Sequence, residues 1–318
     1  MYSQRYKRKG FNVYKRIVVV VSLAALIVFG SSAMARADIL DWKKMYFEVL
    51  NPVPVLNSMA DIRTNFANPL VCSGCHQHHY KEWSNSYHAN SIRNAGFQAL
   101  FMKYLEYLQK EETKQMLGRD AGPEELRQCL FCHAPMVQFA SDSLIQQVAD
   151  AVAQGKWDEI QDIQISCVVC HTITPEKKWT GSFGQTGTMY GPIKDPVSYK
   201  VSGHQSKFSP LHEESKFCGI CHSLRTFNVY CSLVFEQWEG VKGAKQCQEC
   251  HMEVMGETQV AIGGKKRPDH SHFFPGGRFK ETMSKAINLS LNAENTSKRE
   301  IQILVTMKNT VPHNVPDG

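Results

Sequence analysis

The stretch Cys72-Ser-Gly-Cys75-His76-Gln-His-His-Tyr-Lys-Glu-Trp-Ser-Asn-Ser-Tyr-His88 decides how this chain is organised. It opens with the string Cys-x-x-Cys-His. Two thiols three positions apart can each bond one vinyl group of a haem, and the following histidine can place its imidazole beneath the iron. The string therefore indicates covalent attachment of a c-type haem.

The same string occurs four more times, in residues 129–133, 167–171, 218–222 and 247–251. A zinc ribbon also uses Cys-x-x-Cys pairs, but it needs two pairs for each metal and no histidine after the second cysteine. Disulfides and thioredoxin-type pairs leave the repeated histidine equally unexplained. The sequence thus predicts five covalently attached haem c groups, bound by ten of the eleven cysteines: Cys72, Cys75, Cys129, Cys132, Cys167, Cys170, Cys218, Cys221, Cys247 and Cys250.

The first 37 residues have the composition of a secretory signal peptide. Basic residues precede an apolar run over residues 17–29, and Ala35-Arg36-Ala37 provides an Ala-x-Ala cleavage site. The run is shorter than the roughly 20 residues that cross a bilayer, although an uncleaved membrane anchor stays an alternative. We therefore expect a mature chain that starts at Asp38, has no integral membrane span and works in the periplasm or outside the cell.

Removal of this segment changes the charge of the chain. Residues 1–37 hold seven of the Lys and Arg residues and no Asp or Glu, so the formal charge falls from +6 to 6 − 7 = −1. The two propionates of each haem would make the holoprotein more negative, which argues against a nucleic-acid partner. The expected partners are redox proteins or a quinone-linked donor, and a homo-oligomer or a larger multihaem complex stays open.

The fold class follows from the density of haem motifs. The mature chain would hold 318 − 37 = 281 residues, or about 56 for each haem. Porphyrin edges then supply apolar surface that side chains supply in other proteins. We expect a mainly α protein with extensive irregular loops wrapped around five haems. The predicted organisation is a signal peptide over 1–37, a multihaem domain over 38–280 and a β-hairpin segment over 281–318.

Local patterns predict a few regular elements between the motifs. Residues 38–70 have three prolines and little periodicity, which indicates an irregular lead-in. Apolar residues at helical spacing predict a helix over 92–117 that Gly118 ends. A short helix should start at Pro123 and carry Cys129, and a further helix over 144–152 should end at Gly155. The Gly- and Pro-rich residues 172–200 predict a long loop.

The end of the chain has a different period. Apolar residues alternate with polar ones over 287–291 and again over 301–307, with turn composition over 293–299. This pattern predicts a β-hairpin. Because two strands alone are only marginally stable, the hairpin either packs on the haem domain or begins a longer β-domain.

The histidines supply ligands for the iron atoms. The motifs themselves provide five proximal ligands: His76, His133, His171, His222 and His251. An electron-transfer haem needs a second axial ligand, whereas a haem that binds a small substrate leaves this position open. Eight further histidines would suffice for five bis-histidine sites: His78, His79, His88, His204, His212, His270, His272 and His313.

Several strings around the motifs form a second pattern. They are Tyr80, Trp83, Ser86 and His88-Ala89 after the first motif, Tyr190-Gly191-Pro192, Ser209-Pro210-Leu211-His212, Phe217-Cys218-Gly219, Glu236-Gln237-Trp238, His272-Phe273-Phe274-Pro275-Gly276-Gly277, and His313-Asn314-Val315-Pro316 with Gly318. Together they resemble the cytochrome c554-like multihaem cytochromes, relatives of the hydroxylamine oxidoreductase and octahaem reductase groups. The resemblance covers about residues 70–318.

The resemblance implies which histidines are the second axial ligands: His88, His204, His212, His272 and His313. By the same comparison His78 and His79 fall at variable positions, and we expect them at the surface or near haem propionates, although one could ligate a neighbouring haem. His270 is a rival of His272. We expect Met136 to pack in the core rather than bind iron, and Cys231, the odd thiol, to be a buried structural cysteine.

Two classes of function fit these residues. An electron carrier needs a distal ligand on every iron, and the supply of histidines allows this. A reductase or oxidase of a small nitrogen or sulfur compound needs one open iron with donors beside it, but the candidates Tyr190, Lys194 and Arg225 more often pack or carry solvated charge. No motif replaces its histidine with lysine, as the nitrite reductases that resemble this family do. We favour an exported electron carrier without catalytic residues, with an extracellular cytochrome filament as a further alternative.

Overall fold

The computed structural model describes residues 2–5, 48–49, 55–175, 178–179, 187–196, 204–226, 229–297 and 300–315. The chain forms two compact units: a larger one of Trp42–Cys221 with Lys245–Pro275, and a smaller one of Met1–Asp41, His222–Ala244 and Gly276–Gly318. The apolar run and the cleavage site of the predicted signal peptide lie outside the described residues, and that segment stays a prediction. The predicted boundary between residues 280 and 281 also stays a prediction.

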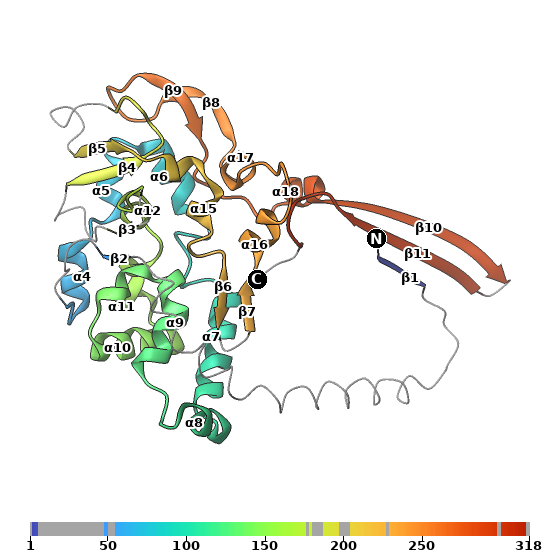
Figure 1. The fold of residues 1–318 in the computed structure, drawn as a ribbon, viewed down its shortest axis with the longest axis horizontal. Coiled ribbons are helices and arrows are strands. Elements are labelled where there is room, and N and C mark those ends of the chain that lie inside the picture. Colours follow the sequence, from blue (N-terminus) through green and yellow to red (C-terminus); the bar gives the residue numbers. More distant parts are fainter. Residues whose placement is uncertain are drawn as a thin grey trace. The chain divides into compact units, whose positions relative to one another are not determined.

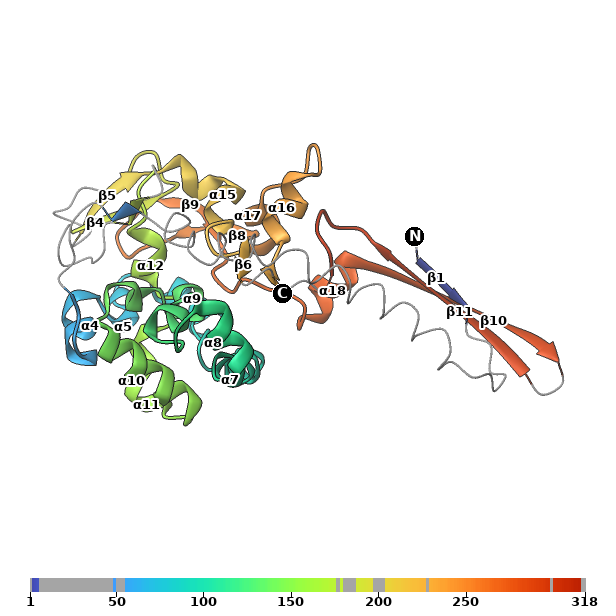
Figure 2. The ribbon, with the colours of Figure 1, turned by 60° about the horizontal axis from the view of Figure 1, so that its bottom comes forward.

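Helices make up most of the first half of the larger unit. They are α4 (Met59–Asn65), α5 (Pro69–Ser73), α6 (Gln77–Ser84), α7 (Ala95–Leu108), α8 (Glu111–Leu117), α9 (Pro123–His133), η1 (Pro135–Phe139), α10 (Asp142–Ala153), α11 (Trp157–Ile160), η2 (Gln161–Ile163) and α12 (Cys167–His171). Figures 1 and 2 show α7 to α11 gathered at one end of this unit.

Helix α10 is the centre of the side-chain core. The Ser141 hydroxyl accepts a hydrogen bond from the Leu144 backbone N–H at the start of the helix (3.4 Å), and Gly155 follows its end at φ +68°, a conformation that favours glycine. Its apolar face is buried, with Ile145 and Val148 fully enclosed. The predicted helix over 144–152 and its end at Gly155 are confirmed.

Helix α9 begins as the sequence predicts. Pro123 occupies its first position, and the Glu125 carboxylate accepts a hydrogen bond from the Gly122 backbone N–H (2.8 Å). The Arg119 guanidinium donates to the same carboxylate (2.8 Å), which is buried. This arrangement fixes the angle at which α9 delivers Cys129.

The predicted single helix over 92–117 is wrong, because two helices are present. The backbone turns extended at Lys110 (ψ 146°), so α7 ends and α8 begins there. The buried Thr113 donates its hydroxyl to the Tyr107 carbonyl (2.7 Å) across this break, and Glu111 suits the positive end of the new helix. Gly118 ends α8 in the left-handed conformation (φ 73°), as predicted.

The predicted irregular lead-in over 38–70 is also wrong in part, because α4 and the first two residues of α5 lie within it. Ser58 and Asp61 form a capping box, in which the Asp61 carboxylate accepts from the Ser58 N–H (2.9 Å) and the Ser58 hydroxyl accepts from the Asp61 N–H (3.2 Å). Met59 and Ile62 then face the core. Pro52 and Pro54 lie outside the described residues.

Short strand pairs and turns make up the rest of the larger unit. β4 (Thr188–Gly191) pairs in parallel with β5 (Gln205–Phe208), and β8 (Val254–Gln259) pairs antiparallel with β9 (Lys266–His270). β2 (Glu48–Val49) and β3 (Lys178–Trp179) form a third, parallel pair. The predicted loop over 172–200 therefore contains strands, while residues 180–186 and 197–200 lie outside the described residues. The remaining helices are η3 (Pro210–Glu213), α15 (Ser215–Cys218) and α17 (Cys247–His251).

The smaller unit contains the predicted C-terminal hairpin. β10 (Ile287–Ser297) pairs antiparallel with β11 (Glu300–Asn309), and β1 (Tyr2–Arg5) pairs with the other edge of β11 (Figure 2). The strands extend through most of the residues predicted as a turn, 293–299. The same unit holds β6 (Leu224–Thr226), β7 (Val229–Ser232), α16 (Val234–Glu239) and α18 (Lys280–Ala286). The mainly helical fold with irregular loops and a terminal hairpin agrees with the prediction.

Candidate haem sites

Every Cys-x-x-Cys-His motif lies on or beside a short helix. The first motif connects α5 and α6, the second ends α9, the third is α12, the fourth follows from α15 and the fifth is α17. Residues three and four apart lie on the same side of a helix. One turn therefore points both thiols and the histidine of a motif toward one flat group, which is the arrangement that haem attachment requires.

The proximal histidines are held by backbone carbonyls. The Nδ1 atoms of four rings lie within hydrogen-bond distance of a carbonyl oxygen: His76 to Val260 (2.8 Å), His133 to Ser91 (3.1 Å), His171 to Tyr190 (2.7 Å) and His251 to Pro275 (2.7 Å). A carbonyl only accepts, so each Nδ1 carries the proton and each Nε2 carries the lone pair that binds a metal. The residues present therefore fit haem iron.

Burial keeps these imidazoles neutral. Burial, followed by neighbouring histidines, lowers the pKa of His272 to about 4, and burial likewise lowers the pKa of His171 to about 4. Burial also lowers the pKa of His212, to about 3, and that of His76. A histidine must be neutral to bind a metal. These rings are already neutral at pH 7, so no proton has to leave before they bind iron.

The structure brings two predicted distal histidines to proximal ones. The ring centres of His76 and His204 lie 6.3 Å apart with planes 26° from parallel, and those of His171 and His272 lie 6.3 Å apart at 24°. An iron bound in line by two imidazoles keeps their ring centres roughly 6 Å apart, because each metal–nitrogen bond is about 2 Å and each nitrogen lies about 1 Å from its ring centre. Both spacings match this requirement.

Hydrogen bonds give these two distal rings the same proton arrangement as the proximal rings. The Nδ1 atom of His204 lies 3.1 Å from the Gln205 carbonyl, and that of His272 lies 2.8 Å from the His270 carbonyl. Nε2 is therefore the nitrogen that each ring presents to a metal. His270 itself places Nδ1 2.9 Å from the Met252 carbonyl, within β9.

His212 differs from the other distal candidates. Its ring centre lies 5.6 Å from that of His171, but its Nε2 donates to the Cys170 carbonyl (3.2 Å), and its buried Nδ1 has no hydrogen-bond partner. This ring presents Nδ1, not Nε2, as its lone-pair nitrogen. It thus lies beside the third motif in a different orientation from His272.

Phe274 lies between His272 and a further predicted ligand, His88, and no role was predicted for it from the sequence. Its ring centre lies 4.5 Å from that of His88 and 5.9 Å from that of His272. Its backbone has φ 52°, which is a true outlier for a bulky residue and costs of the order of 1–3 kcal/mol. Such strain is a mark of functional sites. The string His272-Phe-Phe-Pro-Gly-Gly was the available signal.

The remaining candidates lie in varied surroundings. His79 places Nε2 2.6 Å from the buried Asp269 carboxylate, and the His78 side chain is 56% exposed. Met136 is fully buried in η1, in accord with a packing role. In the smaller unit, His313 donates from Nδ1 to the Asn314 carbonyl (2.8 Å).

The structure describes contacts of two of the donors considered for an enzyme. The Tyr190 carbonyl accepts the His171 bond, and the Lys194 ammonium lies over the Phe208 ring, 5.7 Å from its centre. The side chains of Arg225 and Cys231 lie outside the described part of the chain. Predicted roles for those two stay predictions.

The cysteines show which motifs are neighbours. The Cys72 and Cys167 thiols share a hydrogen bond, which lowers the pKa of Cys72 to about 7. Cys218 and Cys247 share another, which raises the pKa of Cys218. The Cys132 thiol lies 3.8 Å from the Cys221 carbonyl oxygen and also forms a hydrogen bond with the Cys221 thiol. The first motif therefore lies beside the third, and the fourth lies beside both the second and the fifth.

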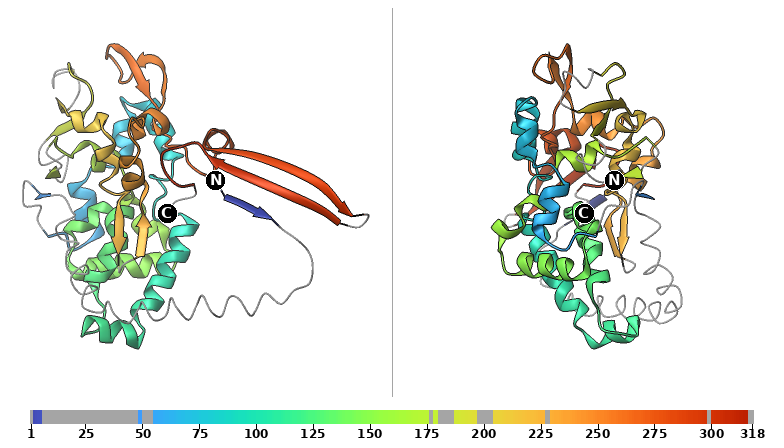
Figure 3. Two further views of the ribbon diagram at one scale, coloured as in Figure 1. Left: turned by 45° about the vertical axis from the view of Figure 1, so that its right-hand side comes forward. Right: turned by 90° about the vertical axis from the view of Figure 1, so that its left-hand side faces the viewer.

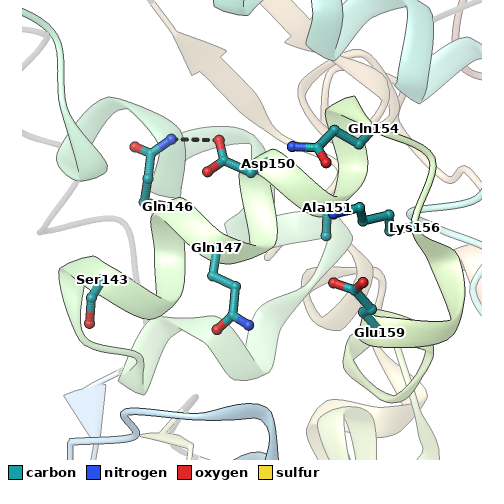
Figure 4. Close-up of a pocket in the computed structure, with 8 residues that line it drawn as sticks. All are labelled: Ser143, Gln146, Gln147, Asp150, Ala151, Gln154, Lys156 and Glu159. Atoms are coloured by element: carbon teal, nitrogen blue, oxygen red, sulfur yellow. Dashed lines mark hydrogen bonds between the residues drawn. The ribbon is translucent and has the colours of Figure 1, made fainter.

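A polar groove of about 520 Å³ lies between α10 and α11, away from these motifs. Figure 4 shows its lining of amide and carboxylate side chains, with a hydrogen bond from Gln146 to Asp150 (2.9 Å). It contains neither a cysteine nor a histidine. The groove has no chemistry for haem or for electron transfer.

Comparison with known proteins agrees with this geometry. Residues 71–172, which include the first three motifs, match the family described as cytochrome c554 and c-prime. The chain is a multihaem cytochrome c, and this part of it is similar to the c554 family. Its five motifs attach five c-type haems by covalent bonds. No curated protein was found to match this cytochrome.

The fold of this multihaem cytochrome is similar to a crystal structure of a penta-heme cytochrome c552 from Thermochromatium tepidum. The two align with a TM-score of 0.53 and 20% sequence identity, over 79% of this chain and 68% of that one. At this level of identity the likeness shows the fold. Within the described residues no helix is both long and apolar enough to cross a membrane.

Proposed function

We propose that this cytochrome carries electrons between redox partners through closely packed haems, each iron bound by two histidines. The observation that carries the proposal is the spacing of 6.3 Å in the pairs His76–His204 and His171–His272. An iron with two protein ligands has no open position for a substrate, but it can accept and donate an electron. When bound, the haems supply the redox chemistry, and the chain fixes their ligands and spacing.

The neighbouring motifs support a continuous route. The first haem would lie next to the third, and the fourth next to the second and the fifth, because the attachment cysteines of these pairs are neighbours. Cys170 of the third motif also lies close enough to Cys221 of the fourth to raise its own pKa, after burial, to about 12. These contacts would join all five haems into one network with the fourth at its branch point.

We further propose that the chain is exported and works in the periplasm or outside the cell. The basic and apolar composition of residues 1–37 supports this. The partners would be redox proteins or a quinone-linked donor. Mass spectrometry of the secreted holoprotein tests the processing step: a mature N-terminus at Asp38 is expected, and retention of residues 1–37 on a membrane-bound chain would overturn it.

Carbon monoxide binding tests the ligation of the irons. The haem-loaded protein is reduced with dithionite, and the CO difference spectrum is quantified against total haem. We expect no adduct, because every iron has two protein ligands. About one CO for five haems would overturn the proposal and favour a reductase or oxidase of a small nitrogen or sulfur compound.

Single substitutions test the two ligand pairs. His204→Ala and His272→Ala should each open one iron and bind about one CO for five haems, with the appearance of one high-spin haem in the electron paramagnetic resonance spectrum. His78→Ala is the matched control, since that ring is 56% exposed, and it should bind none. A His272→Ala protein with five low-spin haems would show that another residue ligates that iron.

A further inference from the structure

A basic surface lies at the turn between β8 and β9. Lys265 and Lys266 are exposed there, and Arg267 follows them. Asp195, four residues after the end of β4, accepts from Arg267 (2.6 Å) and from Lys265 (3.2 Å). Asp195 thus ties the two strand pairs together and neutralises one of the three cations.

The β4–β5 pair adds further basic residues beside the same carboxylate. Lys194 precedes Asp195 and lies over the Phe208 ring, 5.7 Å from its centre, and Lys207 precedes Phe208 in β5, where it pairs with Tyr190 of β4. Both lysines are exposed. The basic surface therefore comprises five cations: Lys194, Lys207, Lys265, Lys266 and Arg267. With the exposed carboxylates Asp195 and Glu257 counted against them, and the buried Asp269 of β9 left out, its formal charge is 5 − 2 = +3, on a proposed mature chain of −1.

This surface is connected to the first haem motif by backbone hydrogen bonds. The turn between β8 and β9 supplies the Val260 carbonyl that holds Nδ1 of His76 (2.8 Å), and the Ile262 N–H donates to the Cys75 carbonyl (3.1 Å). Cys75 is exposed, and so is Ile262 (62%). His204, the partner of His76, comes directly before β5. The basic surface therefore borders the first haem site.

We propose that the basic surface is the docking site for an acidic one-electron carrier protein, which exchanges electrons with the haem attached at Cys72 and Cys75. Charge complementarity selects the partner, because a +3 surface on a chain of net negative charge attracts one face of an acidic protein and orients it. Electron-transfer complexes are small and transient, and a few exposed cations around Ile262 suit such a contact. One electron leaves the reduced carrier and one oxidised haem receives it. The inference rests on the proposed electron-transfer function.

Stopped-flow reduction tests the docking site on the holoprotein. The probes are reduced flavodoxin, an acidic one-electron donor, and hexaammineruthenium(II), a small cation. Lys265→Glu/Lys266→Glu should slow reduction by flavodoxin about tenfold at low salt, and the difference should vanish at about 500 mM salt, where charges are screened within a few ångströms. Reduction by the ruthenium cation should not slow.

Lys103→Glu/Lys110→Glu is the matched control, with the same change of charge at exposed positions on α7 and at the start of α8. Figures 1 and 3 show these helices at the opposite end of the larger unit from β8 and β9. The control should change the flavodoxin rate less than twofold. Equal slowing of flavodoxin by both variants, or slowing by neither, would overturn the docking site.

Cross-linking gives a readout that is independent of electron transfer. A carbodiimide joins lysine amines to carboxylates in contact, and mass spectrometry of the flavodoxin complex should find Lys194, Lys207, Lys265 or Lys266 joined to flavodoxin. If the basic side chains serve only the propionates of the first haem, the wild-type complex will show no flavodoxin joined to these four lysines, and the Lys265→Glu/Lys266→Glu variant will only shift one midpoint potential, which overturns the proposal. CO binding by the wild-type protein would instead contradict bis-histidine ligation and leave the cross-link result intact.

Discussion

Two stretches of the larger unit, residues 55–175 and residues 204–221 with 245–275, bury different kinds of side chain. The first buries a large apolar set that includes Ile62, Phe101 and Ile145. In the second, among the residues that the structure describes, Leu211 is the only apolar side chain that is buried. The other buried side chains of the second stretch are polar: Ser209, Ser215, Gln248, Asp269 and Ser271.

The difference indicates what stabilises each stretch. Apolar burial contributes about 25 cal/mol for each Å² removed from water, so the first stretch has a side-chain core of its own. The second carries the fifth haem motif and both cysteines of the fourth but very little apolar burial, so its apolar contacts must come largely from porphyrin. The same chain therefore combines a protein-cored part and a cofactor-cored part.

Removal of single haems tests this comparison with the largest expected effect. Cys247→Ala/Cys250→Ala removes the fifth haem and should make residues 245–275 cleave about tenfold faster in limited proteolysis, because local opening controls cleavage. Cys129→Ala/Cys132→Ala removes the second haem and should leave α10 protected by its own core. Mass spectrometry of the fragments gives both rates, and equal sensitivity of the two stretches would contradict the comparison.

A cavity in the side-chain core comes next in size. Ile145→Ala should lower the free energy of unfolding by about 2–5 kcal/mol, because Ile145 is fully buried. Val254→Ala, at a position 53% exposed on β8, is the control and should cost less than about 0.5 kcal/mol. Denaturant titration followed by far-ultraviolet circular dichroism measures both. A similar loss of unfolding free energy in the two variants would mean that the side chains buried around α10 do not form a stabilising core.

The buried carboxylate of the second stretch should give a smaller change. Asp269 accepts hydrogen bonds from His79 (2.6 Å) and Thr258 (3.2 Å). Asp269→Asn weakens this charge-assisted bond and should cost about 1.5–3 kcal/mol, seen as faster hydrogen exchange in β8 and β9. The control is Asp142→Asn, whose carboxylate is 78% exposed beside Arg127 and should matter little. Unchanged exchange in β9 after Asp269→Asn would show that the polar core contributes nothing.

Loss of a helix cap should give the smallest change in the free energy of unfolding. The Asn94 side chain accepts from the N–H groups of Gly96 (2.8 Å) and Phe97 (3.2 Å) at the start of α7. Asn94→Ala should cost about 1 kcal/mol, measured by the same titration. Lys103→Ala, an exposed change within α7, should be near neutral. A loss as large as that of Ile145→Ala would mean that the cap, not the core, fixes α7.

The sequence predicted the parts of the fold that local signals specify. Pro123, Gly118 and Gly155 mark helix ends through backbone preferences, and all three were correct. The break between α7 and α8 was missed because it depends on Thr113, whose burial and bond to Tyr107 are tertiary facts. The helix α4 was missed because the capping box at Ser58 was outweighed by nearby prolines.

The haem sites divide in the same way. Haem attachment and the proximal histidines were predicted from the sequence itself, because each motif is five contiguous residues. The distal candidates were named only through a family resemblance, and their pairing with haems was not predicted, because the proposed pair of His76 and His204 joins residues far apart in the sequence. The orientation of the His212 ring toward the Cys170 carbonyl could not be predicted from the sequence, because it depends on which ring nitrogen the fold buries.

The carbonyl partners of the proximal histidines also set an order of assembly. His171 needs a residue only 19 positions further along, whereas His76 needs Val260, which is 184 positions away. At a synthesis rate of about 5–20 residues per second, that gap is roughly 10–40 s. The first haem site to be made thus waits far longer for its carbonyl partner than the third, and of the four sites for which the structure describes a carbonyl partner only the fifth, which needs Pro275, is completed later.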